Sequence, residues 1–436
     1  MKAYSNTGDI PRFIQDQMEP TWYKELRNQA FSLFEQVSWP SLKDEEWRRT
    51  DISSFDLDGL SFVGSEPGVS VTTHPTEGYA GAISFTNGTS TLASISAQEQ
   101  GNGVVFQTLD QFLADNSEPT SPQAKAFTKG FQQSLDSADN KVYRWSLAAA
   151  SYGVVLYVPK NHECSAPFRI DFKADKEDMV TMPQVAVILE QGAKAVVELC
   201  WSGQGGFLIN QNNFFVVGNG ANLSFTQMQT CGDEVVVFTN GKSIVERDAR
   251  FRHFESILGG GFVKNRVDSS LVGPGSDLEL DGIYFADEER HMDLRTVQHH
   301  YSDHAVSNAV YRGAVADEAH TIYQGLIEVS PKGKGTDAYL SNKNLVLNDG
   351  AQADSIPCLQ INTDDVRCSH GSTTGKLRAD QIFYLMSRGF SREQAQEALI
   401  LAYFQEVLGR VHESLQDEIV GLLEHQISKI KADMFQ

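Results

Sequence analysis

The chain has 436 residues, enough for two or three domains around a large hydrophobic core. Its 57 acidic residues exceed its 36 basic ones, and the net charge of −21 argues against non-specific binding to nucleic acid and against docking on anionic lipid. Its five cysteines are widely spaced and include no Cys-x-x-Cys pair, which argues against a disulfide framework and fits a reducing compartment.

The first residues, MKAYSNTGDIPRF, contain no apolar stretch of the kind that a signal peptide needs. The longest apolar runs elsewhere are far too short to span a bilayer. We therefore expect a cytoplasmic protein without a membrane span.

Residues 1–150 are predicted to form a mixed N-terminal region, partly helical and partly α+β. Apolar residues recur at helical spacing from residue 9 to Pro40 and again from 108 to 151, while the Gly-, Ser- and Thr-rich stretch from 61 to 105 predicts short strands and loops. The charged segment LKDEEWRRTDISSF is typical of a solvated helix face. An exposed Trp47 in that segment would be explained as an anchor for packing or for a partner.

Residues 151–375 are predicted to be a strand-rich core, because runs such as VVLYV, QVAVILE and NNFFVVG alternate with Gly and Asn turns. A short signature, in which a Gly-Ala, Gly-Ser or similar turn precedes an apolar strand, recurs at Gly192, Gly220, Gly275 and Gly350. The intervals of 28, 55 and 75 residues are close to one, two and three units of about 25–28 residues, the length of one coil in a strand solenoid. An antiparallel sandwich is the competing architecture.

A stack of coils leaves two rows of unpaired strand backbone, one at each end, and these need a cover. The N-terminal region and the C-terminal helices are candidates, and a second, similar solenoid is the alternative.

Residues 376–436 are predicted to form a helical C-terminal domain. LRADQIFYLMSR is the first helix, with Gly389 as its cap, and Ser391 with Gln394 has the pattern of a capping box that begins a second helix. The apolar face of this second helix is wider than a simple surface helix needs, which indicates burial against the solenoid or a groove for a partner.

The chemistry of the chain is expected at Cys368 and His370, within DDVRCSHGSTTG. If this stretch is a strand, the two side chains point to the same face and could ligate a metal or act as nucleophile and base. The competing interpretation is a structural cysteine beside a hydrogen-bonded histidine. A second candidate metal cluster consists of His291, His299, His300 and His304, although exposed or hydrogen-bonded histidines are far commoner than ligands.

The run LVLNDGAQADSIPCLQINTDDVRCSHGSTTGKLRADQIFYLMSRGF resembles the SufB/SufD family, which comprises scaffold subunits of the SUF system for iron–sulfur cluster assembly. The resemblance continues through SNAVYRG, IYQGLIEV, DAYLSNKNL, AAASYGVVLYVPKN and EEWRRTD, and so covers most of the chain. SufB-like chains have a scaffold cysteine in the strand that here reads SNKNLVL and an EHEATTS-like segment in place of CSHGSTTG. This chain has neither and is more similar to the SufD branch.

The resemblance implies a mainly β fold: a right-handed parallel β-helix core with a helical N-terminal region and a helical C-terminal domain. It implies pairing with a SufB-like subunit through the β-helices and docking of a SufC-like ATPase on the C-terminal helices. His370 would lie at the SufB interface as a candidate ligand for a nascent, transiently held iron–sulfur cluster, with Cys368 as a second candidate and the remaining ligands from the partner.

The implied function is that of a non-enzymatic scaffold subunit, and the sequence contains no ATP-binding loop, since its glycine runs match neither a phosphate loop nor a dinucleotide fingerprint. Two alternatives stay open. One is a β-helix carbohydrate-active enzyme that uses acids such as Asp364 and Asp365. The other is a stand-alone metal-binding protein that uses Cys368, His370 and the histidines from His299 to His304.

Overall fold

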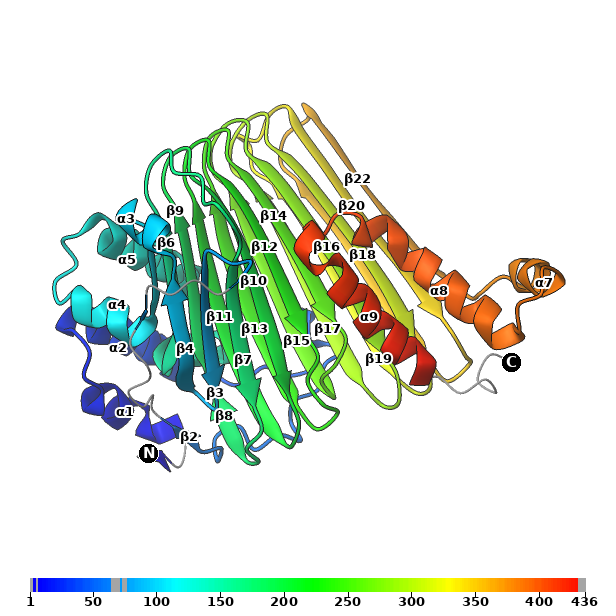
Figure 1. Cartoon of the computed structure of the whole chain (residues 1–436), viewed down its shortest axis with the longest axis horizontal. Coiled ribbons are helices and arrows are strands. Elements are labelled where there is room, and N and C mark those ends of the chain that lie inside the picture. Colours follow the sequence, from blue (N-terminus) through cyan, green and yellow to red (C-terminus); the bar gives the residue numbers. More distant parts are fainter. Residues whose placement is uncertain (1–2, 5–6, 64–70, 73–76, 430–436) are drawn as a thin grey trace.

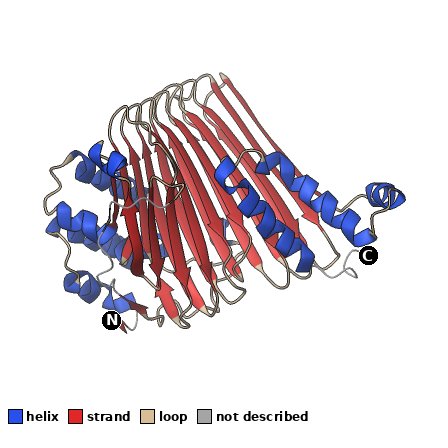
Figure 2. Ribbon diagram, viewed as in Figure 1, coloured by secondary structure: helices blue, strands red, loops and turns tan. Residues whose placement is uncertain are grey.

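The computed structural model describes residues 3–4, 7–63, 71–72 and 77–429. Its centre is a parallel β-solenoid of about eight turns, with helices at the start and at the end of the chain, so the predicted mainly β, β-helix fold is confirmed (Figure 1). Helices form 26% of the chain and strands run side by side through the whole solenoid (Figure 2).

Each turn of the solenoid contributes one strand to each of two sheets. Sheet A contains β9 (Pro183–Leu189), β11 (Phe207–Val217), β13 (Val236–Val245), β15 (Phe262–Leu271), β17 (His291–His300), β19 (His320–Val329) and β21 (Gln352–Ile361). Sheet B contains β7 (Phe168–Ala174), β10 (Lys194–Gly203), β12 (Asn222–Gln229), β14 (Arg250–Ile257), β16 (Asp277–Ala286), β18 (Val306–Val315), β20 (Thr336–Val346) and β22 (Val366–Gly375). Within each of these runs neighbouring strands are parallel.

The N-terminal region adds shorter strands at the beginning of the solenoid. They are β1 (Ala3–Tyr4), β2 (Phe62–Val63), β3 (Gly81–Thr86), β4 (Thr89–Ile95), β5 (Val105–Thr108), β6 (Tyr152–Val158) and β8 (Met179–Thr181). The β3–β4 hairpin extends sheet B beside β7, and β5 pairs antiparallel with β6 at the start of sheet A.

The repeat is longer and less uniform than the sequence predicted. Val236 pairs with Phe262, 26 positions later, whereas His320 pairs with Gln352, 32 positions later. Gly192, Gly220 and Gly275 occupy equivalent turns that lead from sheet A to sheet B, with φ of 70°, 66° and 70°. The assignment of Gly350 to the same turn was wrong, because it lies between β20 and β21, at the opposite edge.

Side chains alternate between the inside and the outside of the solenoid, as expected for strands. The inward residues form one continuous core between the sheets, lined among others by Leu199, Phe225, Leu280, Tyr311 and Leu340. The outward residues form two further clusters with the helices, so both sheets are buried on two faces. This explains the near-continuous apolar runs of the strands.

The outer face of sheet A is covered by N-terminal helices. Phe127 in α5 and Trp145 in α6 pack in one cluster with Phe214 on β11 and Phe238 on β13. The helices of this region are α1 (Ile10–Asp16), α2 (Thr21–Glu35), α3 (Ala97–Gly101), α4 (Leu109–Asp115), α5 (Pro122–Ser137) and α6 (Lys141–Ala148).

The outer face of sheet B is covered by the C-terminal helices α8 (Arg392–Leu408) and α9 (Glu413–Lys429), which lie across the strands in Figure 1. Phe404 and Ile419 pack with Phe285 of β16 and Val310 of β18. The predicted capping box of α8 is confirmed, because the Ser391 side chain accepts from the backbone of Gln394 and the Gln394 side chain accepts from the backbone of Ser391.

The helices therefore cover the outer faces of the sheets, while the last turn of the solenoid stays open. None of the residues of β21 or β22 is buried, whereas the preceding strands are buried along most of their length. Within the described residues, no helix is both long enough and apolar enough to cross a membrane.

Candidate functional site

Cys368 and His370 lie on β22, the last strand of sheet B. This strand pairs in parallel with β20, where Cys368 is opposite Ala338 and His370 is opposite Leu340. The two residues are two positions apart on one strand, so both point to the face that continues the solenoid interior. Cys368 is half-buried and packs against the inner core, and His370 is exposed.

The thiol of Cys368 is held in its protonated form. Burial raises its pKa, and the nearby carboxylate of Asp337 raises it further, against a hydrogen bond from the backbone of Ala338. A thiol binds metal as the thiolate. Cys368 therefore becomes a ligand only when a cation or a partner's positive group stabilises its negative charge.

This pair does not complete a metal site within the chain. Among the residues that the structure describes, only one group of three or more His, Cys, Asp and Glu side chains has its ligand atoms gathered within 4.8 Å, and it contains neither Cys368 nor His370. Asp364 and Asp365 lie exposed on the turn that leads into β22. The open end thus offers a thiol and an imidazole on an accessible strand face.

The histidines from 291 to 304 do not converge. His299 contacts Glu328 at 2.6 Å and Asp268 at 3.2 Å, on the outer side of β17. His300 points inward, is fully buried and hydrogen-bonds to Ser307 at 2.8 Å. His304 occupies a turn with φ of 54°. Each has a separate structural environment, which fits the hydrogen-bonded interpretation rather than a shared metal.

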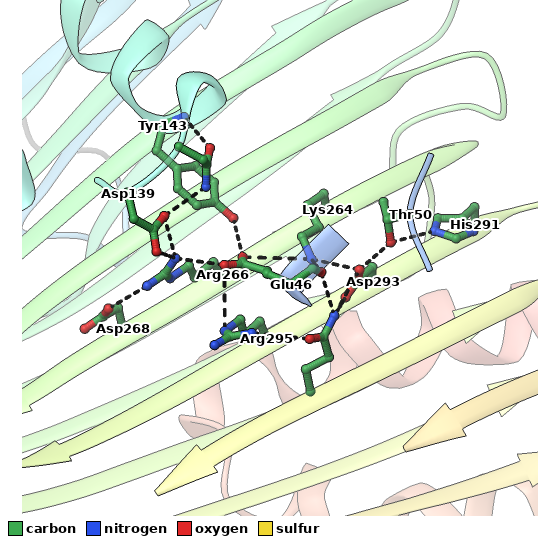
Figure 3. A network of polar contacts seen from close by, with 12 residues as sticks. Glu46, Thr50, Asp139, Tyr143, Lys264, Arg266, Asp268, His291, Asp293 and Arg295 are labelled. Carbon is green, nitrogen blue, oxygen red and sulfur yellow. Dashed lines mark hydrogen bonds and ion pairs between the residues drawn. The ribbon is translucent and has the colours of Figure 1, made fainter. Parts of the chain in front are cut away.

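A charged network ties the N-terminal region to sheet A through residues 44–50, here called the N-terminal strap. Figure 3 shows Glu46 of the strap between three cations from the strands, with Arg266 at 3.0 Å and with Lys264 and Arg295 at 3.9 Å. Burial alone would raise the pKa of Glu46, but these three cations outweigh it and hold the pKa below its usual range.

The interpretation of this segment as a solvated helix face was wrong for Glu46 and Trp47. Trp47 is buried, packs against Phe238 with ring centroids 6.4 Å apart, and faces the ammonium group of Lys264 at 5.0 Å. Lys264 itself is fully buried and pairs with Asp293 at 2.7 Å. The strap is therefore an anchor within the chain.

A cluster of potential metal ligands that was not predicted from the sequence lies at the opposite end of the solenoid. Glu99 of α3 meets His162 and Cys164 of the β6–β7 connection, and these are the three ligand-type side chains gathered within 4.8 Å. Glu99 is buried, and its carboxylate lies 2.5 Å from the Nε2 atom of His162. His162 and Cys164 have the same one-residue separation as Cys368 and His370, so the spacing was visible, whereas Glu99 is 63 positions away.

Cys164 also lines a groove of about 800 Å³ between the start of sheet B and the α8–α9 connection. Charged side chains of both signs line this groove; among them are Lys194, Arg252, Arg410, Glu163 and Glu279.

Exposed apolar side chains gather on α7 (Ala379–Ser387) and on the connection between α7 and α8. We call Phe383, Tyr384, Met386 and Phe390 the α7 patch. Their exposed fractions are 73%, 55%, 44% and 45%, and none of the residues of α7 is buried. Clustered exposed aromatic residues on a short helix are typical of a surface that binds another protein.

Comparison with known proteins gives a family match and several relatives. The family model described as SUF system FeS cluster assembly, SufBD core domain, matches residues 172–403. An iron–sulfur cluster assembly SufBD family protein of Mycobacterium leprae is 29% identical over 298 residues, which are 66% of this chain and 76% of the relative. A protein of the same description from Staphylococcus epidermidis is 23% identical over 414 residues, which are 89% of this chain and 85% of the relative.

Proposed function

Since the chain belongs to the SufBD family of iron–sulfur cluster assembly proteins, we propose that it is the SufD-like, non-catalytic subunit of a SUF scaffold complex. In this role it pairs with a SufB-like subunit through the last turn of the solenoid. It holds a nascent iron–sulfur cluster only transiently, with His370 and Cys368 as ligands from its side. The cluster is the cargo of the complex and leaves it for other proteins.

The observation that carries the proposal is the uncovered last turn. Within the part of the chain that the structure describes, no strand pairs with the outer edges of β21 and β22, and none of the residues of these two strands is buried. A bare strand edge in a parallel stack is a ready surface for another β-structure. A homologous subunit with a similar end would cover it.

The ligand chemistry supports a shared site at that surface. Thiolate and imidazole are both established ligands of iron, but two ligands do not hold a cluster. Because Cys368 and His370 lie on the open strand, a partner that covers β22 brings its own ligands next to them. The raised pKa of the Cys368 thiol fits a site that forms on assembly.

The C-terminal domain supplies a second surface. We propose that the α7 patch, extended by α8, docks a SufC-like ATPase. The aromatic side chains of the patch are exposed and have the amphipathic character of binding hot spots. ATP-driven closure of the docked ATPases would then move the two solenoids and open or form the site between them.

The five cysteines are free and separate in the structure, which supports the proposed cytoplasmic, reducing setting.

An anaerobic co-purification of the tagged chain from its own host tests the proposal. Wild type is expected to recover a SufB-like protein, an ATPase, iron and sulfide. His370→Ala is expected to recover both proteins but less iron and sulfide. His425→Ala, which changes an exposed histidine on α9, is the matched control and should behave as wild type.

Recovery of the chain alone, without iron or an ATPase, would overturn the scaffold role. In that case, polysaccharide binding would be tested next, with Asp364 and Asp365 as the acids. Tight stoichiometric metal in the isolated chain that is lost on changing His370 would favour a stand-alone metal-binding protein.

A further inference from the structure

We propose that Glu99, His162 and Cys164 bind one divalent transition-metal ion, best matched to Zn²⁺, at the end of the solenoid opposite Cys368 and His370. This site is separate from the cluster surface, since α3 and β22 lie at the two ends of the stack (Figure 1). It does not depend on the function proposed above.

Two well-anchored segments bring the three ligands together. Glu99 is the third residue of α3, and its backbone is capped by the side chain of Ser96. The connection that carries His162 and Cys164 is tied to the next turn of the solenoid, because the amide of Cys164 donates to the carbonyl of Lys194 at 3.0 Å. The backbones that carry the three side chains are therefore held next to each other in the folded protein.

A carboxylate, an imidazole and a thiolate together form a set of ligands that divalent transition metals bind. Zn²⁺ binds thiolate, imidazole and carboxylate in tetrahedral sites, and three protein ligands leave its fourth position for water or another ligand. A thiolate in the set argues against Mg²⁺ or Ca²⁺, which prefer oxygen. This combination of ligands therefore favours a divalent transition metal such as Zn²⁺ over Mg²⁺ or Ca²⁺.

The geometry needs a small adjustment to accept the ion. The carboxylate oxygen of Glu99 and Nε2 of His162 lie 2.5 Å apart, at hydrogen-bond distance. With bonds of about 2.0–2.1 Å to a tetrahedral ion, two such atoms lie about 3.3 Å apart. His162 is on a turn and its side chain is 17% exposed, so it can move by this amount.

The second oxygen of Glu99 is already held in place. It accepts hydrogen bonds from the backbone of Ser165 at 2.9 Å and from the Ser165 hydroxyl at 2.7 Å. Hydrogen bonds of this kind orient carboxylate ligands in metal sites. Cys164 also packs against the inner core, so metal binding is the property that distinguishes the proposed site from a purely structural cluster.

The groove described above provides a route for the ion, since Cys164 is part of its wall. On binding, the Cys164 sulfur gives its proton to solvent, and His162 binds as the neutral tautomer whose proton is on Nδ1, so that Nε2 is free to coordinate the ion. No redox change occurs in this step.

The test uses the metal-stripped full chain with Co²⁺ as a spectroscopic probe. Wild type is expected to bind one Co²⁺ per chain with a sulfur-to-cobalt absorption in the near ultraviolet, which Zn²⁺ then displaces. Cys164→Ser should lose this absorption. Cys200→Ser, which changes a cysteine of similar exposure on β10, and Cys368→Ser should keep it.

Ser165→Ala provides a milder variant that leaves all three ligands in place. Loss of an outer hydrogen bond to a ligand typically weakens metal binding by about 10–100-fold, and a decrease in this range is expected. Three results would each overturn the site: no sulfur-to-cobalt absorption in wild type, its persistence in Cys164→Ser, or its loss in Cys368→Ser. X-ray absorption of the Zn²⁺-loaded wild type should show one sulfur ligand, and a spectrum without sulfur would also overturn it.

Discussion

The ring of Tyr311 on β18 fills the space that a Cβ atom on Gly282 of β16 would occupy. The two residues are direct partners across the strands, and a Cβ added to Gly282 would lie 2.2 Å from the ring. The same arrangement recurs in reverse between Tyr284 and Gly313, where the distance is 2.1 Å. These glycines set the position of two fully buried tyrosines inside the solenoid.

We therefore expect Gly282→Ala to destabilise the protein by about 1–3 kcal/mol, because the ring of Tyr311 has to move within a packed core. Urea denaturation measures the change. Gly421→Ala on α9 is the control, since no atom lies within 4 Å of its added Cβ. Alanine should stabilise that helix by roughly 0.5–1 kcal/mol. A neutral Gly282→Ala would contradict the packing described here.

Tyr311 also donates its hydroxyl to Glu255 at 2.8 Å, deep in the core. Burial raises the pKa of Glu255 to about 7, against hydrogen bonds from Tyr311 and Asn265 that lower it. Between the ordinary pKa of 4.5 and about 7, the folded state keeps a proton that the unfolded state has lost. The contribution of this group to stability therefore falls as the pH rises through that window.

The glutamine side chain in Glu255→Gln cannot ionise, so this variant should not lose stability in this way as the pH rises. The free energy of unfolding of the variant, relative to wild type, is expected to increase between pH 4.5 and pH 7 by on the order of 2–3 kcal/mol. Denaturation of both proteins over this pH range measures the difference, in which titrating groups far from residue 255 cancel; one titratable side chain close to it is His253, whose Nε2 lies 3.8 Å from Glu255. A difference that does not change with pH would show that Glu255 ionises in the folded protein as it does in the unfolded one.

His253 gives a dependence of the opposite sign. It is buried, stacks on Phe251 with ring centroids 5.7 Å apart, and neither ring nitrogen has a hydrogen-bond partner. Burial lowers its pKa to about 3 from an ordinary value of 6.5. Below about pH 6.5, the unfolded state therefore binds a proton at this histidine that the folded state does not bind. The stability of the fold consequently decreases as the pH falls.

His253→Phe retains an aromatic ring among its phenylalanine neighbours and removes the titrating group. Relative to wild type, its stability should be about 2 kcal/mol more favourable at pH 5 than at pH 8. An equal effect of His253→Phe at both pH values would exclude protonation as the cause.

Lys264 and Asp293 form a fully buried ion pair on neighbouring strands of sheet A. Lys264→Met leaves the Asp293 carboxylate buried without its cation, and we expect a loss of about 3–5 kcal/mol. The double variant Lys264→Met/Asp293→Leu should recover part of this loss. Arg250→Ala breaks the more exposed pair with Asp277 at 2.8 Å and should cost at most about 1 kcal/mol.

Phe383→Ser/Tyr384→Ser tests the proposed ATPase docking. Both side chains are exposed, so thermal stability should stay near that of wild type, whereas recovery of the ATPase should decrease. Leu92→Ser, which changes an exposed apolar residue on β4, is the control. Retained ATPase with the double variant would assign docking to another surface.

The features that were predicted correctly from the sequence are those that depend on residues close together in the chain. The strand runs, the capping box at Ser391 and Gln394, and the common face of Cys368 and His370 all follow from periodicities of two or a few residues. The length of the coil was less well predicted, because turns of different length separate the strands and Gly350 lies in a different turn.

Features that depend on distant residues were missed. Glu46 is surrounded by cations that come about 220 positions later in the chain, so its local sequence gave only the appearance of a solvated face. Glu99 likewise meets His162 and Cys164 only because the N-terminal region folds against the first turns of the solenoid. The charge pattern of a segment depends on that segment alone. Which segments contact each other is determined by the fold.

The bare last turn limits how many molecules can join. Among the described residues, the opposite end of the stack terminates in the antiparallel pairs β1–β2, β3–β4 and β5–β6, which do not match the parallel strands β21 and β22. Head-to-tail addition of copies into a fibre therefore lacks a receiving face. Two molecules, or two homologues, that meet through their bare ends use up both, and the assembly then closes as a pair about a twofold or pseudo-twofold axis.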